Sequence, residues 1–268
     1  GKLLVEAQGG EERAKYGDGL IKEYSKRLTN ELGKGYSTRV LKKMRIFYML
    51  VQKGPTLSAL FENVNMTWSN VCEVLKLKNI KEIEYYLNLS NELCLTTREL
   101  RTRIKLDEYN RLPVEVKEKL RSNEVVSTSE KVPSPVVLQD LKVDGKLTEK
   151  MVQTWIDENS IKFCNALGEG YTYCGSQYKI KISLNYNYID VLLFNVIDMN
   201  YVVVEIKVTE LKKEHIGQIE VYMNYIDRNL KKISQDKTIG IIICKKDDHF
   251  VIDYCSDKRI ISREFELV

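Results

Sequence analysis

The amino-acid sequence predicts a two-domain α+β protein: an all-α, helix-turn-helix-like domain over residues 1–121 and an α/β domain over residues 140–268. Three observations lead to this fold class. Apolar residues of the first domain recur three and four positions apart, which is the period of an α-helix. A polar segment with Pro133 and Pro135 follows, and we interpret residues 122–139 as a linker. Beyond it, helical and strand-like patterns follow one another in the order αβββαβ.

The first domain is predicted to consist of short helices. Apolar spacing indicates a helix from about Glu11 to Leu32, and Gly33 follows as a helix-ending residue. Ser37 is the expected N-cap of a second helix. Further helical patterns follow Thr67 and span Lys81–Leu89 and Thr97–Asn110. Short helices of this kind are typical of a helix-turn-helix-like bundle.

The second of these helices has a strongly basic surface. Its apolar residues form one stripe, and the remaining surface carries Arg39, Lys42, Lys43 and Arg45. A basic face supplies affinity for phosphates irrespective of base sequence, so we expect these four side chains to bind nucleic acid. A solvated surface and the seam of a homodimer are the alternatives, because periodicity does not distinguish burial within a chain from burial between chains.

The second domain is predicted to open with a helix from Leu147 to Leu167, which Gly168 ends. Three strands follow, over Tyr171–Ser183, around Asp190 and around Glu205. We expect the next elements to be a helix from about Lys213, an Ile-rich buried strand over Thr238–Cys244, and edge strands over Phe250–Tyr254 and Glu264–Val268.

Two of the predicted strands carry charged residues inside apolar runs. Alternation along Tyr201–Val208 sends Glu205 and Lys207 to one face of the strand. A carboxylate in a buried strand is costly unless it is paired or bound to a metal. Asp190, on the preceding strand, is the expected third member of this group.

The order of an Asp, an intervening hairpin and then Glu-x-Lys resembles the PD-(D/E)XK nuclease motif, with Asp190, Glu205 and Lys207 on its three functional positions. The short sequence motifs around these residues resemble the C-terminal nuclease domain of the YhcG family of bacterial proteins. They are Gly175-Ser-Gln-Tyr178, Tyr188-Ile-Asp-Val-Leu-Leu-Phe194, Val204-Glu-Ile-Lys207, Ile216-Gly-Gln-Ile219, Tyr222-Met-Asn-Tyr225 and Thr238-Ile-Gly-Ile-Ile-Ile-Cys244. Others resemble that family's N-terminal domain of unknown function: Arg13-Ala-Lys-Tyr-Gly17, Leu28-Thr-Asn-Glu31, Gly33-Lys-Gly-Tyr-Ser37, Met44-Arg-Ile-Phe-Tyr48, Thr67-Trp-Ser69 and Thr97-Arg-Glu-Leu100. Together these motifs span nearly the whole chain.

The resemblance implies a restriction-endonuclease-like fold and metal-dependent hydrolysis of phosphodiester bonds. Asp190, Glu205 and the main-chain carbonyl of Ile206 would bind Mg²⁺ or Mn²⁺. Lys207 would orient the attacking water and offset charge in the transition state. Gln218 matches a family position where its amide could hold Lys207 or a phosphate oxygen, and an ordinary exposed helix residue is the alternative.

Other polar residues are weaker candidates. An acidic residue of the first core helix often completes the metal site in such nucleases, and of Glu149, Glu158 and Glu169 we slightly favour Glu158. We interpret Tyr222 mainly as a packing residue, and Gln177 is a weaker candidate still. His215 and His249 are expected to take no part in the chemistry, since neither has a second histidine at ligand spacing.

Composition agrees with these expectations but does not select among them. The chain of 268 residues has a formal net charge of +4, which permits a polyanionic partner without requiring one. Six cysteines without a C-x-x-C pair argue against a zinc site, and we interpret them as reduced thiols of a cytoplasmic protein. No apolar run approaches the roughly 20 residues of a membrane span, so we expect no membrane partner.

We therefore expect a cytoplasmic, metal-dependent endonuclease that acts on DNA in a defence, mobile-element or repair role. The alternative is a catalytically silent nucleic-acid-binding or assembly protein that keeps the fold. Retention of Asp190, Glu205 and Lys207 together favours the enzyme, because a silent protein has no need to keep three charges in buried strands.

Overall fold

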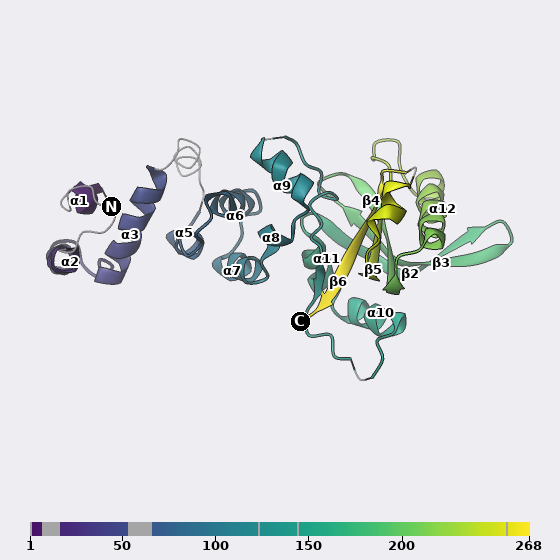
Figure 1. Cartoon of the computed structure of the whole chain (residues 1–268), viewed down its shortest axis with the longest axis horizontal. Coiled ribbons are helices and arrows are strands. Elements are labelled where there is room, and N and C mark those ends of the chain that lie inside the picture. The colour runs from purple at the N-terminus through teal and green to yellow at the C-terminus, as the bar shows by residue number, and fades with distance from the viewer. Residues whose placement is uncertain (1, 7–16, 53–65, 123, 144, 256) are drawn as a thin grey trace. The chain divides into compact units, whose positions relative to one another are not determined.

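The computed structural model describes residues 2–6, 17–52, 66–122, 124–143, 145–255 and 257–268 (Figure 1). The chain forms two compact units that divide between Tyr109 and Asn110. The described part of the first unit is helical, and the second unit is a mixed sheet with helices, which confirms the predicted fold class. None of the helices described is both long and apolar enough to cross a membrane.

The helices described in the first unit are α1 (Lys2–Glu6), α2 (Gly17–Leu32), α3 (Thr38–Val51), α5 (Trp68–Val74), α6 (Ile80–Glu92), α7 (Thr97–Lys105) and α8 (Glu108–Arg111), the last of which crosses the boundary between the units. Four of them, α3, α5, α6 and α7, begin at side-chain caps that the sequence supplies. Ser37 caps α3 as predicted, and Thr96 forms a reciprocal capping box with Glu99. The expected start of the first long helix, Glu11, lies outside the described residues.

Asn70 joins three of these helices. From α5 its amide donates to Ser90 Oγ on α6, at 3.1 Å, and to the carbonyl of Leu95 before α7, at 2.8 Å. The helix predicted over residues 97–110 is instead two helices, because Asp107 adopts a left-handed φ of 55° between α7 and α8.

The second unit is built on a six-stranded sheet. Its strands are β1 (Val136–Leu138), β2 (Tyr171–Ile182), β3 (Asn185–Asn195), β4 (Asn200–Glu210), β5 (Ile239–Lys246) and β6 (Ile260–Leu267), and its helices are α9 (Val114–Arg121), α10 (Glu149–Glu158), α11 (Ser160–Leu167), α12 (Lys213–Asn229) and α13 (His249–Asp253). The strand order is β1-β6-β5-β4-β3-β2. Pairing is antiparallel from β2 to β4 and parallel from β4 to β1.

Helices cover both faces of this sheet. Trp155 and Phe163 of α10 and α11 belong to the apolar cluster that includes Val204 of β4. On the other face, α12 packs its apolar stripe, with Ile219 and Met223, against β4 and β5. The central strand β4 is therefore buried on both sides, which is the environment expected for a strand of nearly continuous apolar residues.

The segment expected to be a linker is part of the second unit. β1, at residues 136–138, pairs in parallel with β6. Thr128 donates from its main-chain N–H and its hydroxyl to Asp198, at 3.0 and 2.6 Å, and accepts from Asn195 at 2.6 Å. Thr128, one of the polar residues that suggested a linker, therefore hydrogen-bonds to both sides of the connection between β3 and β4.

Three further elements differ from the prediction. The helix expected over residues 147–167 is divided at Asn159, whose φ and ψ of −126° and 37° are not helical. The apolar run Phe250–Tyr254 falls on helix α13 rather than a strand, since runs of this length fit either structure. The strand expected at an edge over Glu264–Val268 belongs to β6, which lies between β5 and β1.

Candidate active site

Asp190 lies on β3 where the ladder between β3 and β4 ends. The last pair is Val191 with Val204, and beyond it Asp190 Oδ2 accepts the main-chain N–H of Ile206 at 2.9 Å. The N–H and C=O of one strand residue point to the same edge, so the Ile206 carbonyl also points toward β3. Asp190 Oδ1 accepts a hydrogen bond of 3.2 Å from Gln177 of β2. The carboxylate thus takes the place of a missing main-chain pair.

Glu205 of β4 is a buried carboxylate that is only half satisfied. The residue is 1% exposed, and its Oε2 accepts from Lys207 Nζ at 3.2 Å. Its Oε1 is buried and has no hydrogen-bond partner among the described residues. Burial, followed by the negative charge of Asp190, raises the pKa of Glu205 to about 7 against the opposing effect of Lys207. This site favours the arrival of a positive charge.

Lys207 brings one positive charge to the site. Burial lowers the pKa of Lys207, but the carboxylates of Glu205, Asp190 and Glu149 outweigh burial and raise that pKa above its ordinary value. Lys207 is therefore protonated at neutral pH. An ammonium in this state donates hydrogen bonds and does not remove protons.

The donor set fits a hard divalent cation. Asp190 and Glu205 supply two carboxylates, and Ile206 supplies a main-chain carbonyl, all of them oxygen ligands of the type that Mg²⁺ prefers. The orphaned Glu205 Oε1 is an atom that such an ion would satisfy. Within the described residues, no group of three or more His, Cys, Asp or Glu side chains is placed to hold a metal. Water and substrate would complete the coordination.

Among the acidic candidates of the helical layer, Glu149 is the one beside this site. It is the first residue of α10, and its charge acts on both Lys207 and His215. Glu158 ends the same helix, roughly 13 Å further along its axis, and lines a different pocket. Glu169 lies 4.0 Å from Lys131. The geometry does not support the preference for Glu158.

Helix α12 places two predicted residues next to one another. Gln218 donates from Nε2 to the hydroxyl of Tyr222 at 3.2 Å, and not to Lys207. Tyr222 is buried, which raises its pKa, and the charges of Glu205 and Asp190 raise that pKa further. Tyr222 therefore lies within the electrostatic influence of the two carboxylates, which its apolar neighbours in the sequence did not indicate.

His215 also lies closer to the site than expected. Its Nδ1 accepts the main-chain N–H of Lys212 at 3.1 Å at the start of α12. Burial, and then the positive charge of Lys207, lower the pKa of His215, so the imidazole is neutral at pH 7. The sequence signal that could have identified it is its position three residues before Gln218 on the same helix. The side chain of His249 lies outside the described residues.

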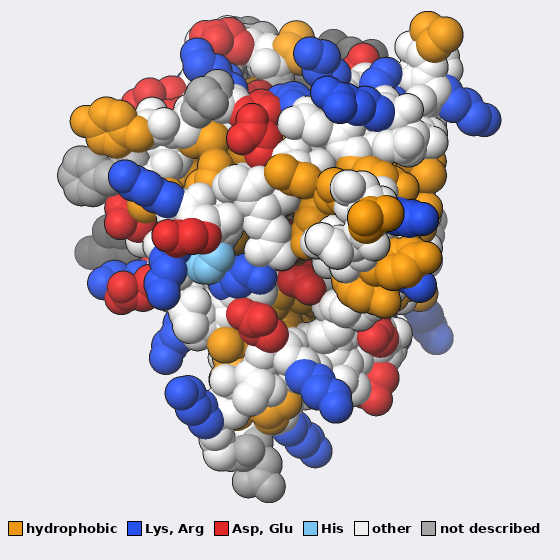
Figure 2. Space-filling view, turned by 90° about the vertical axis from the view of Figure 1, so that its right-hand side faces the viewer, with side chains coloured by type: hydrophobic (Ala, Val, Ile, Leu, Met, Phe, Trp, Pro, Cys, Tyr) orange, Lys and Arg blue, Asp and Glu red, His pale blue; other side chains and the backbone are white. Residues whose placement is uncertain are grey.

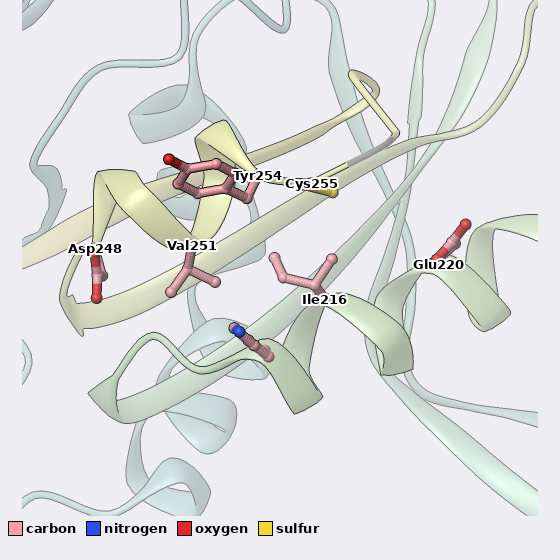
Figure 3. Close-up of a pocket in the computed structure, with 7 residues that line it drawn as sticks. Ile216, Glu220, Asp248, Val251, Tyr254 and Cys255 are labelled. Atoms are coloured by element: carbon pink, nitrogen blue, oxygen red, sulfur yellow. The ribbon is translucent and has the colours of Figure 1, made fainter.

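Figure 2 views the end of the second unit that carries this site, where side chains of both charges and a histidine gather around a hollow. A separate pocket of about 590 Å³ lies between α12 and α13, with Ile216 and Val251 facing it from the two helices (Figure 3). Asp190, Glu205 and Lys207 do not line this pocket, and we assign no chemistry to it.

The basic residues predicted on α3 divide into two pairs. Arg39 and Lys43 line a pocket of about 430 Å³ together with Trp68 of α5 and Arg101 of α7. Lys42 and Arg45 are not among the residues of that pocket. The structure thus brings half of the predicted group together and adds Arg101, which lies far away in the sequence.

Comparison with protein families confirms the resemblance. Residues 129–266 match the family described as the YhcG PDDEXK nuclease domain, and residues 1–111 match the DUF1016 N-terminal domain. The chain is 25% identical over 279 aligned residues to "Putative nuclease YhcG" of Escherichia coli (strain K12), covering 91% of this chain and 74% of that protein.

Two solved structures are also similar, each at 17% identity and a TM-score of 0.32. They are the crystal structure of a repair endonuclease from Pyrococcus abyssi, matched over 47% of this chain and 49% of that chain, and the structure of an EndoMS–dsDNA complex, matched over 47% and 48%. The matches thus span about half of each solved chain.

Proposed function

The chain belongs to the YhcG family of PD-(D/E)XK nuclease-fold proteins, and on that premise we propose that it is a metal-dependent endonuclease that hydrolyses phosphodiester bonds of DNA. Glu205 carries the proposal: a carboxylate 1% exposed, with one oxygen unpartnered in the described structure, beside Asp190 and Lys207. A buried carboxylate oxygen without a hydrogen bond is costly, and a bound cation removes that cost.

The residues at the end of the β3–β4 ladder hold the metal in this proposal. Asp190, Glu205 and the carbonyl of Ile206 bind Mg²⁺ or Mn²⁺. The ion, when bound, polarises the scissile phosphate and activates water. Asp190 is itself fixed by the N–H of Ile206 and the amide of Gln177, so its carboxylate is oriented before a metal arrives.

Lys207 contributes its charge and its hydrogen bonds. One donor of the ammonium is directed to Glu205 Oε2, which leaves two donors for the attacking water and a phosphate oxygen. Negative charge grows on that phosphate in the transition state, and a preorganised ammonium stabilises it. The linked side chains of Gln218 and Tyr222 add an amide and a hydroxyl that position the phosphate.

The first unit binds DNA outside the active site in this proposal. Arg39 and Lys43 contact phosphates from the pocket between α3, α5 and α7, with Lys42 and Arg45 extending the basic surface of α3. A homodimer through the same helices is the competing role for this surface. Cleavage of cytoplasmic DNA in defence, mobile-element biology or repair is the biological setting that we propose.

The test is a cleavage assay over substrates and metals. Supercoiled, linear, branched and single-stranded DNA, and RNA, are incubated with Mg²⁺, Mn²⁺ or EDTA, using the wild type, Asp190→Asn and Glu205→Gln. We expect cleavage of DNA by the wild type with Mg²⁺ or Mn²⁺ only, and none by either variant. Cleavage by both folded variants would overturn the assigned site. DNA binding without cleavage under every metal would instead identify a catalytically silent member of the family.

A further inference from the structure

β2 and β3 continue beyond the other strands as a two-stranded arm, defined here as residues 177–190. β3 pairs with β4 only from Val191 onward, whereas β2 and β3 remain paired out to Ile182 and Asn185. Figure 1 shows this hairpin projecting from the second unit. A long ribbon joined to the sheet at one end presents both strands to its surroundings.

The two faces of the arm differ in character. One face has Ile180 and Ile189, which are at most 1% exposed and belong to the apolar cluster of α12. The other has two cross-strand pairs, Lys179 with Tyr188 and Lys181 with Tyr186. All four of these side chains are exposed, with Tyr186 at 56% and Tyr188 at 47%. The buried face fixes the arm, so the Lys/Tyr face has a set orientation.

The arm has a positive charge and no compensating acid before Asp190. Residues 171–189 contain no Asp or Glu, and Lys179 and Lys181 are their only charged residues. Within the described structure, neither lysine forms an ion pair. Both ammoniums lie at the ring of Tyr186, at 3.8 and 5.9 Å from its centroid. Cations and aromatic rings combined in this way are the components of a surface for single-stranded nucleic acid.

One end of the arm lies at the candidate metal site. Gln177 and Asp190, the first and last residues of the arm, are hydrogen-bonded at 3.2 Å. At a strand rise of about 3.3 Å per residue, the pair with Lys179 lies roughly 7 Å beyond Asp190 and the pair with Lys181 roughly 13 Å. The next phosphates of a bound strand would lie at about these distances from the scissile phosphate.

We propose that the Lys/Tyr face of the arm binds the nucleic-acid strand next to the scissile phosphate and favours substrates that have unpaired bases there. Lys179 and Lys181 contact phosphates, and Tyr186 and Tyr188 stack on bases. Bases within a duplex have both faces covered by their neighbours, so only an unpaired segment offers them to these rings. This proposal rests on the proposed function for the chemistry at Asp190.

The test measures binding separately from cleavage. Fluorescence anisotropy in EDTA over a salt series compares a single strand with a duplex of the same sequence. Lys179→Gln with Lys181→Gln should reduce the slope of log K against log salt for the single strand by about 1.4, or about 0.7 for each lost contact. Tyr186→Leu with Tyr188→Leu should weaken single-strand binding about tenfold or more and leave duplex binding within about twofold.

A matched control removes two lysines from the opposite end of the sheet. Lys232 follows the C-terminus of α12 and Lys237 precedes β5, so Lys232→Gln with Lys237→Gln makes the same change in charge far from Asp190. Lysine variants of the arm that match this control, or tyrosine variants that weaken single-strand and duplex binding equally, would overturn the proposal. Cleavage in Mg²⁺ is measured in parallel. If the wild type cleaves DNA and the arm variants bind like the control, the proposal for the arm is wrong and the proposed function stands. If the arm variants lose single-strand binding but the wild type does not cleave, the proposed nuclease function is wrong and the binding role of the arm stands.

Discussion

Glu73 in the first unit and Glu205 in the second are both buried glutamates, at 8% and 1% exposure, but their surroundings are opposite. Glu73 accepts from Arg101 at 2.9 Å and also from Lys76, and these partners lower the pKa of Glu73 to about 2 despite its burial. Glu205 has one oxygen without a hydrogen bond in the described structure and a second carboxylate nearby, and the pKa of Glu205 is raised to about 7. A satisfied buried charge stabilises a fold, whereas a half-satisfied one marks a place for a ligand.

The largest effect that separates the two glutamates is on activity. Glu205→Gln should reduce cleavage by at least about 10³-fold, because the metal loses a charged ligand. The same change should raise the free energy of unfolding of the metal-free protein at pH 8 by about 1–3 kcal/mol, since it removes a buried charge. Cleavage rates and urea titrations measure the two effects. If the variant is inactive because it is less stable than the wild type, Glu205 stabilises the fold as Glu73 does, and the contrast between the two glutamates is wrong.

Lys207→Met should have a smaller effect on rate. We expect a loss on the order of 10²-fold, because one preorganised donor to the transition state is removed. Binding of Mg²⁺, measured by calorimetry, should persist, since Asp190, Glu205 and the Ile206 carbonyl remain. Loss of metal binding in this variant would show that Lys207 holds the carboxylates in place instead of acting on the substrate.

The pH dependence of stability should have opposite signs for the two glutamates. The folded-state pKa of Glu205 is raised, so its stabilising contribution is present below about pH 4.5 and is lost as the pH rises toward 7. The pKa of Glu73 is lowered, so its contribution is present above about pH 4.5 and is lost as the pH falls toward 2. Saturating Mg²⁺ should abolish the part of the pH dependence that Glu205 causes, and it should raise the midpoint of thermal unfolding at pH 8. A midpoint unchanged by Mg²⁺ would contradict the metal assignment.

Glu73→Gln should affect stability and leave the chemical step unchanged, although Glu73 lines the pocket with Arg39, Lys43 and Arg101. The variant loses the charge-assisted hydrogen bonds to Arg101 and Lys76, and we expect its free energy of unfolding to fall by about 1–3 kcal/mol. Its cleavage rate under stable conditions and at saturating DNA should remain within about twofold of the wild type. Urea titration and the cleavage assay check both statements, and a large loss of rate would assign Glu73 a role beyond its ion pairs.

The smallest effect distinguishes the two pairs of basic residues on α3. Arg39→Gln with Lys43→Gln should reduce the slope of log K against log salt for duplex DNA by about 1.8, if both contact phosphates. Lys42→Gln with Arg45→Gln should reduce it less, because these residues do not line the pocket with Arg101. Sedimentation of both variants tests the rival role, since a change in mass would indicate a dimer interface.

The sequence predicted those features of the site that depend on a single strand. Alternation placed Glu205 and Lys207 on one face of β4, and the structure joins them at 3.2 Å. It did not rank Glu149 above Glu158, because the end of α10 that approaches the site depends on how the helix packs against the sheet. The sequence did not predict that His215 and Tyr222 lie near the site for the same reason, since their surroundings come from β3 and β4 and not from their neighbours along the helix.

The fold shows a similar division between local and distant information. Caps such as Ser37 and the αβββαβ order are local signals, and the structure contains both. The break at Asp107 depends on one residue in the left-handed region, which helical periodicity does not reveal. The place of residues 128–138 depends on Asp198 and β6, which lie 60 or more residues later in the chain.

The pairing of β1 with β6 determines where the chain can be cut. A fragment that starts at residue 140 would lack β1 and would expose the N–H and C=O groups of β6 as a free sheet edge, which is a template for aggregation. It would also lose the carbonyls of Glu130 and Val132 that accept hydrogen bonds from Arg263. A fragment that starts at Asn110 keeps these contacts and the hydrogen bonds between Arg111 and the segment Ser134–Pro135. The stretch that the sequence suggested as a linker thus contains β1, an edge strand of the six-stranded sheet.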